Sequence, residues 1–137
     1  MTWPTQFDIF PRNRPKRGNY AAEFRLQCAI ARVLREHINP GWTSTHLPFG
    51  EKRDPATAGR LKAMGVTPGW PDLMLIGPRR IYFLELKRRG GKLSEHQSVR
   101  ATALIGAGAG YGVAQSFDDA VSILQAWGCV SKRLHPQ

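Results

Sequence analysis

The sequence predicts an α/β sandwich, in which helices flank a small central mixed β-sheet. Three observations lead to this prediction: a stretch with apolar residues at helical spacing, two short apolar runs around a tight turn, and two later helical stretches that enclose a short strand. The resulting order of helix, strand, hairpin, helix, strand and helix is typical of helices packed on a sheet. A length of 137 residues suits one such domain.

The first predicted helix spans residues 20–38, which contain no Gly or Pro. Its apolar residues recur on one helical face, with three more beside them: Phe24, Cys28, Ala31, Leu34 and Ile38, then Leu26, Ile30 and Val33. Asn39-Pro40-Gly41 ends the helix, because an Asn-Pro step followed by Gly favours a turn. The β-branched and aromatic run 42–49 predicts a strand, and Pro48 indicates that it ends there or lies at a sheet edge.

The middle of the chain contains the clearest structural pattern. Residues 50–69 mix charges with Gly and Pro, which predicts a long surface loop with a helical turn or two near residues 56–64. The apolar runs 72–76 and 81–87 then flank the turn residues 77–80. Two such runs around a short turn predict a β-hairpin.

The last third of the chain predicts helix, strand and helix. Ser94 can cap a helix that runs to about Ile105 and stops at the glycine-rich segment 106–110. A short strand at 111–115 follows, and Ser116 or Asp118 can cap a final helix through Trp127. We therefore expect three regions: a basic, Pro-rich arm at 1–19, a folded domain at 20–128 and a tail at 129–137.

The net charge restricts the partners of the chain. Twenty Lys and Arg against ten Asp and Glu give a formal charge of +10, which favours nucleic acid or an anionic membrane surface. The arm shares this charge, and it can either contact DNA or be a solvated tail. No apolar run approaches the roughly 18 residues of a membrane span, and the first residues lack the order of a signal peptide. We expect a cytoplasmic protein without a membrane partner, in which the isolated Cys28 and Cys129 are packed as small apolar residues.

The hairpin places two carboxylates opposite each other. If the turn pairs Ile76 with Ile81, continuing the antiparallel register sets Asp72 opposite Glu85. Opposed Cβ atoms lie about 4.5 to 5.5 Å apart, and like charges at that separation destabilise a sheet. A shared cation would explain the pair.

Lys87 lies on the same face of the strand as Glu85, about 6.6 Å further along. Mg²⁺ prefers one or two carboxylates together with water and phosphate oxygens, and Mn²⁺ can substitute. This combination predicts metal-assisted hydrolysis of a phosphodiester, with Lys87 orienting water or offsetting charge on the phosphate. The alternative is that these charges only solvate a sheet edge, but the apolar surroundings of Glu85 argue for a bound partner.

The segment Gly69-Trp70-Pro71-Asp72-Leu73, followed by Glu85-Leu86-Lys87, resembles the PD-(D/E)xK nuclease superfamily and, more closely, the VRR-Nuc family. In that family a G-x-P-D-L segment precedes an E-x-K strand, a G-K-L-S stretch and a helix that carries Gln. Here the continuation is Gly91-Lys92-Leu93-Ser94 with Gln97, and later Ala114-Gln115-Ser116-Phe117-Asp118-Asp119. The resemblance covers roughly residues 20–127 and implies a restriction-endonuclease-like α/β sandwich.

The resemblance also implies further site residues. Glu23, with Gln27 one helical turn later, stands where the family has an acidic residue that joins the site as an outer or second-metal ligand. The backbone carbonyl of Leu86 is an implied ligand beside Asp72 and Glu85. Gln97 stands at a position that lies beside the catalytic lysine in the superfamily, which implies a role in the site. Glu23 can instead be an exposed residue that favours the helix start, and Gln97 can close a capping box with Ser94, alone or together with a site role. His46, alone on its predicted strand, is more typical of a core or surface group.

Small members of the family resemble Holliday-junction resolvases, which implies a homodimer that cuts branched DNA such as four-way junctions or flaps. Recognition of DNA shape is expected, because no major-groove reading helix or zinc finger is visible. The alternatives are a non-catalytic DNA-binding module on the same fold and, less favoured, an RNA-binding protein that uses its aromatic residues. The basic residues expected to contact nucleic acid are Arg79, Arg80, Arg88, Arg89 and Lys92 around the proposed site, and Arg53, Arg60 and Lys62 in the long loop.

Overall fold

The computed structural model describes residues 17–50 and 54–133. Along these residues the elements are α1 (Arg17–His37), β1 (Thr43–His46), the short 3-10 helix η1 (Pro48–Gly50), α2 (Pro55–Ala63), β2 (Leu73–Ile76), β3 (Ile81–Leu86), α3 (Glu95–Gly106), β4 (Gly110–Ala114) and α4 (Phe117–Trp127). The order of elements is the predicted one. α1 begins at Arg17, inside the expected arm, and the rest of the arm lies outside the described residues.

The four strands form one mixed sheet in the order β1-β2-β3-β4. β1, β2 and β3 pair antiparallel, whereas β4 pairs parallel to β3. α3 makes the crossover between β3 and β4, because parallel neighbours cannot be joined by a tight turn. The predicted α/β sandwich around a small mixed sheet is confirmed.

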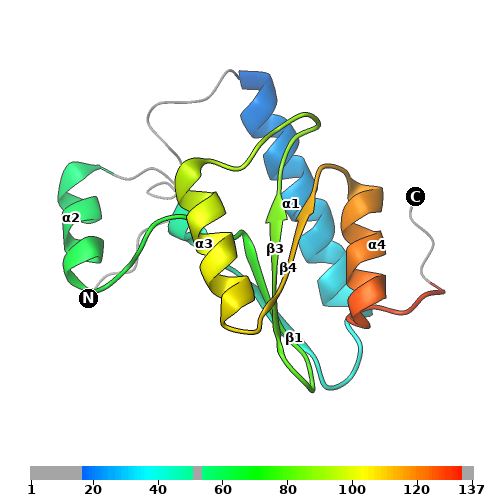
Figure 1. Cartoon of the computed structure of the whole chain (residues 1–137). Helices are drawn as coiled ribbons and strands as arrows, with labels where there is room; N and C mark the ends of the chain where they lie inside the picture. The colour runs from blue at the N-terminus through cyan, green and yellow to red at the C-terminus, as the bar shows by residue number, and fades with distance from the viewer. Residues whose placement is uncertain (1–16, 51–53, 134–137) are drawn as a thin grey trace.

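Helices cover both faces of the sheet. Alternate residues of β2 and β3, such as Leu75 and Leu84, form the main core with Ile30 of α1 and Leu124 of α4. α3 lies on the opposite face, in front of the sheet in Figure 1, where Phe83 is buried. Glu85 follows Phe83 at a spacing of two and therefore points to the α3 side.

The N-terminal part of α1 differs from the prediction. The apolar face was expected to run through Phe24 and Cys28, but Phe24 is 48% exposed and Cys28 is exposed as well. Burial begins at Ile30, because the first turns of α1 extend beyond the sheet. Cys129 is buried, as predicted.

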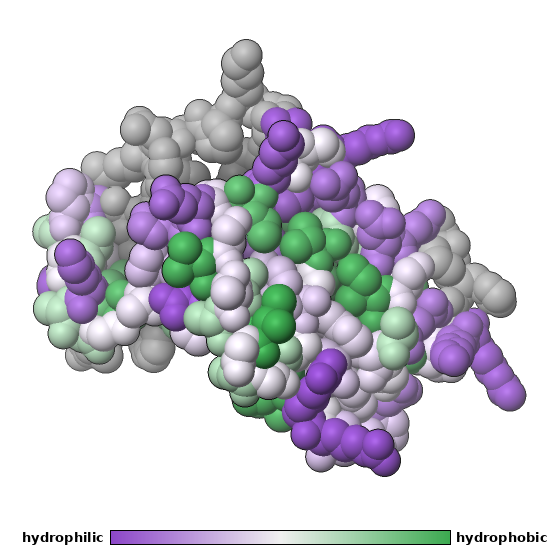
Figure 2. All heavy atoms as spheres, in the orientation of Figure 1, coloured by the Kyte–Doolittle hydropathy of each residue, from purple (hydrophilic) through white to green (hydrophobic). Residues whose placement is uncertain are grey.

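The helix α2 lies at the periphery of the molecule. No residue of α2 is buried, and Figure 1 shows this helix standing apart from the sheet. Figure 2 shows the face that carries α3, where hydrophilic side chains project around the rim and hydrophobic residues lie between them. Within the described part of the chain, no helix has both the length and the apolar character needed to cross a membrane.

Candidate active site

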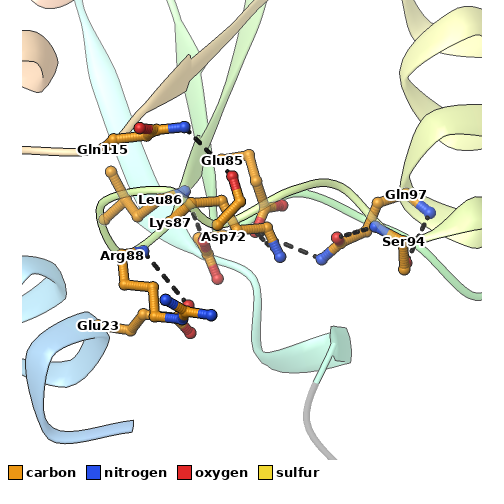
Figure 3. A network of polar contacts seen from close by, with 10 residues as sticks. Glu23, Asp72, Glu85, Leu86, Lys87, Arg88, Ser94, Gln97 and Gln115 are labelled. Carbon is orange, nitrogen blue, oxygen red and sulfur yellow. Dashed lines mark hydrogen bonds and ion pairs between the residues drawn. The ribbon is translucent and has the colours of Figure 1, made fainter. Parts of the chain in front are cut away.

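The hairpin brings Asp72 and Glu85 together as its register predicts. The observed pairs run from Ile76 with Ile81 to Leu73 with Leu84, so Asp72 lies one residue beyond the ladder on the side of Glu85. Its carboxylate turns toward β3, where Oδ2 accepts a 2.8 Å hydrogen bond from the backbone N–H of Leu86 (Figure 3).

The main chain of Asp72 is held from its other side by β1. Its carbonyl oxygen accepts hydrogen bonds from the N–H of Leu47 at 2.7 Å and from the Nδ1–H of His46 at 2.8 Å. With the carboxylate bond to Leu86, three hydrogen bonds fix Asp72 in position. The side chain of an expected site residue is therefore preorganised by both neighbouring strands.

Glu85 is the one buried charged residue of the described chain, with 3% of its surface exposed. Its Oε1 accepts a 3.4 Å hydrogen bond from Nε2 of Gln97 and lies 3.8 Å from Nζ of Lys87. Its Oε2 is buried without a hydrogen-bond partner among the described residues. Leaving such an oxygen unpaired costs free energy, which makes this position a candidate for binding a ligand.

Electrostatics make the same point. Burial, followed by the charge of Asp72, raises the pKa of Glu85 to about 9. Lys87 lowers this pKa only in part, and Glu23 raises it further. The positive charge of Lys87 is thus too small to stabilise both neighbouring carboxylates in their charged forms, and a cation between them would supply the missing charge.

Gln97 closes the predicted capping box and also contacts Glu85. Its side-chain oxygen accepts a 2.9 Å hydrogen bond from the backbone N–H of Ser94, which completes the capping box at the start of α3. Its amide nitrogen donates to Glu85 from the same conformation. The capping bond therefore orients the amide toward the carboxylate.

Glu23 lies on the same side of the molecule but not in the inner group. Its carboxylate accepts a 3.4 Å hydrogen bond from the backbone N–H of Arg88, one residue after Lys87 (Figure 3). In the described residues, no three His, Cys, Asp or Glu side chains gather closely enough to enclose a metal ion. The inner group consists of two carboxylates, which is the number that Mg²⁺ commonly takes from a protein. Asp72 and Glu85 fit a hard divalent cation on this ground and on that of the unpaired Oε2.

Two solved structures share this architecture. One, described as a VRR_NUC domain, matches with 23% identity and a TM-score of 0.55 over 77% of this chain and 97% of that chain. The other, described as a VRR_NUC domain protein, has 23% identity and a TM-score of 0.66 over 77% and 87%. The chain has a VRR_NUC fold. No protein-family model and no curated protein matches the sequence. The two solved structures therefore confirm the resemblance seen in the motifs at the level of the fold.

Three of the expected basic residues lie in the turn that leaves β3 after Lys87. Arg88 and Arg89 directly follow Lys87, Lys92 comes five residues after it, and all three are exposed. The side chain of Gln115 holds this turn: its Oε1 accepts from the N–H of Gly90 and its Nε2 donates to the carbonyl of Gly91, both at 3.2 Å. The turn is therefore tied to the end of β4.

The prediction that Arg79 and Arg80 surround the site is wrong. They lie in the turn at the other end of the hairpin, and Glu85 is five residue steps along the strand from Arg80, or about 16 Å. The guanidinium of Arg80 instead lies over the ring of Tyr82, 4.9 Å from its centroid. The turn residues were assigned to the site because they are close in sequence, but the two ends of a hairpin are far apart.

The remaining expected basic residues have less definite positions. Arg60 and Lys62 are exposed in the last turn of α2. Arg53 lies outside the described residues. The Leu86 carbonyl as a metal ligand stays a prediction.

Sequence reasoning missed Tyr111 and assigned no role to Gln115. Tyr111 pairs with Phe83 across the parallel strands, and burial together with the charges of Glu85 and Asp72 raises the pKa of its hydroxyl to about 12. This phenol therefore stays protonated near the carboxylates at neutral pH. No local pattern indicated it, because the register between β3 and β4 is set through a whole intervening helix.

Proposed function

We propose that this chain is a VRR-Nuc nuclease that hydrolyses DNA phosphodiester bonds with a divalent cation, Mg²⁺ or Mn²⁺. One observation carries the proposal: the buried Glu85, with an unpaired carboxylate oxygen, lies beside a second carboxylate and 3.8 Å from a lysine. The names of the two similar structures and their shared fold support it.

Asp72 and Glu85 would hold the cation, with Glu23 in an outer position and the Leu86 carbonyl as a further ligand. A bound cation supplies Lewis acidity and lowers the pKa of water near a scissile phosphate. Lys87 orients the attacking water or offsets charge on the phosphate, and Gln97 keeps the Glu85 carboxylate in place. Arg88, Arg89 and Lys92 track the phosphates on either side.

The substrate we propose is branched DNA, such as four-way junctions or flaps, cut internally by a structure-selective endonuclease. The net charge of +10 supports a polyanionic substrate, and the motif resemblance supports a homodimer with two active sites. Sedimentation velocity measurements would establish whether the chain dimerises.

The decisive experiment is cleavage of a labelled panel of duplex, single-stranded, flap and four-way-junction DNA with Mg²⁺, Mn²⁺ or EDTA. We expect cutting that requires the metal and that Lys87→Ala reduces by at least about 100-fold, as loss of a positioned catalytic group does. Lys132→Ala is the matched control. Lys132 is exposed in the C-terminal segment, and its substitution removes the same charge away from the carboxylates.

Two results would contradict the proposal. Cutting that persists equally in EDTA or in Lys87→Ala would rule out this site. Tight DNA binding without cutting under any metal would instead favour a non-catalytic binding module on the same fold, which the intact trio Asp72, Glu85 and Lys87 argues against.

A further inference from the structure

A groove with a volume of about 320 Å³ runs between α1 and β1, separate from the carboxylate pair. Ser44 and His46 of β1 pair with Leu75 and Leu73, which point into the core under α1, so Ser44 and His46 face α1 as well. These side chains do not fill the space beneath the helix. The lining residues are Gln27, Ala31, Leu34, Arg35, Ile38, Trp42, Thr43, Ser44, Thr45, His46 and Leu73.

One end of the groove adjoins the candidate active site. Its lining includes Leu73, the residue after Asp72, and His46, whose ring donates to the carbonyl of Asp72. On the helix side, Gln27 lies one turn after Glu23, whose carboxylate accepts from Arg88. The groove on the α1 face of the sheet therefore begins one residue from Asp72 along the chain.

The chemistry of the lining suits a nucleotide. The Nε2 of Gln27 is buried and has no acceptor among the described residues, which is costly for an amide. Arg35 is exposed along the same wall and can meet a phosphate, and Leu34, Ile38 and Trp42 provide an apolar and aromatic surface for a base. An unpaired base offers both the acceptor that Gln27 lacks and a face for this surface.

We propose that the groove binds one unpaired nucleotide of the DNA strand that is cut, next to the scissile phosphate. This inference rests on the proposed nuclease function and narrows its substrate. A space of about 320 Å³ is closer in size to a single nucleotide than to a base-paired segment. The preferred DNA is therefore one with an unpaired segment at the cleavage site, a single strand or a flap, over a fully paired four-way junction.

The test measures binding without cleavage, by fluorescence anisotropy in EDTA, with a flap, a single strand and a fully paired duplex of matched sequence. Gln27→Leu keeps the size of the side chain but removes the amide, and Arg35→Ala removes the guanidinium. Each variant should weaken flap and single-strand binding by about fivefold or more, as loss of one hydrogen bond or charge-assisted phosphate contact does, and duplex binding by less than about twofold. Arg32→Ala is the control, since Arg32 lies on α1, pairs with Glu36 and does not line the groove.

Equal losses for duplex and single strand, or an equal loss in Arg32→Ala, would overturn the proposal. A second measurement does not depend on the variants: titration of a phosphorylated dinucleotide into ¹⁵N-labelled wild-type protein. The side-chain amide signal of Gln27 and the backbone amides of residues 43–46 should shift, and shifts confined to the basic turn after Lys87 would contradict the assignment. Because neither experiment requires cleavage, a nuclease that lacks this subsite is distinguishable from a protein that is not a nuclease.

Discussion

Glu85 shows how a single residue can work against folding while preparing a site. A carboxylate with 3% exposure, beside Asp72 and with one unpaired oxygen, is more easily protonated in the folded chain than in the unfolded one. The charged form of such a residue does not stabilise the folded chain. The cation proposed above would bind the charged form and so explain the position of Glu85.

The raised pKa of Glu85 leads to a prediction about metal-free protein. The folded chain holds the Glu85 proton up to a pKa of about 9, whereas the unfolded chain releases it near 4.5. The stability contributed by the protonated form is present below pH 4.5 and is lost as the pH rises toward 9. In urea unfolding with EDTA, we expect the free energy of unfolding to fall over this range by up to about 1.4 kcal/mol per pH unit from this group.

Glu85→Gln carries a neutral side chain at every pH and should remove this contribution. The difference between wild type and variant isolates Glu85 from other titrating groups. If both proteins show the same pH dependence between 4.5 and 9, Glu85 does not titrate in this way.

At the scale of elements, the segment before β2 is docked on the first turns of α3. Arg100 donates to the carbonyl of Pro68 at 3.2 Å, and its guanidinium lies 5.0 Å from the centre of the Trp70 ring. Gly69, with a φ of 83°, packs so closely that a Cβ atom there would overlap the carbonyl of His96. This contact sets Asp72 relative to Gln97, the residue after His96.

Gly69→Ala should therefore destabilise the fold more than a positive φ alone explains. Gly65→Ala is the matched control, because Gly65 has a φ of 100° and nothing within 4 Å of an added Cβ. We expect a loss of about 1–2 kcal/mol in the control from backbone strain, and roughly 1–3 kcal/mol more at Gly69 from overlap. Urea denaturation of both variants measures the difference, and equal losses would show that α3 yields to the added methyl group.

At the scale of the whole molecule, the distribution of charge matters more than its sum. The twenty Lys and Arg residues behind the formal charge of +10 include groups in the hairpin turn, on α2 and in the turn after β3. The turn after β3 lies directly beside the carboxylates, whereas Arg79 and Arg80 lie at the opposite end of β3. In the proposed complex, the basic residues after β3 would neutralise phosphates of the DNA strand at the site, and those of the hairpin turn would not.

Salt titrations of flap binding in EDTA should separate the two groups. Each phosphate contact contributes a slope of about 0.9 to the plot of log affinity against log salt concentration. The double variant Arg88→Ala/Arg89→Ala should lower the slope by about 2, and Arg79→Ala/Arg80→Ala should leave it nearly unchanged. A larger reduction in the second variant would mean that DNA crosses the hairpin turn.

The sequence by itself was enough to predict the structural features that depend on neighbouring residues. Strand alternation and a four-residue turn were enough to predict the register that brings Asp72 to Glu85, because an antiparallel hairpin is specified by neighbouring residues. The capping box of Ser94 and Gln97 was equally local. The order of elements and the fold class followed from the same short-range patterns.

Only the tertiary structure decided what depends on contacts between distant segments. It placed Tyr111 beside the carboxylates through the parallel pairing of β4, moved burial on α1 from Phe24 to Ile30, and separated Arg80 from the site. It also opened the groove between α1 and β1. Periodicity shows that a helix has an apolar side, but how far that helix extends past a sheet is set by packing between elements that are remote in sequence.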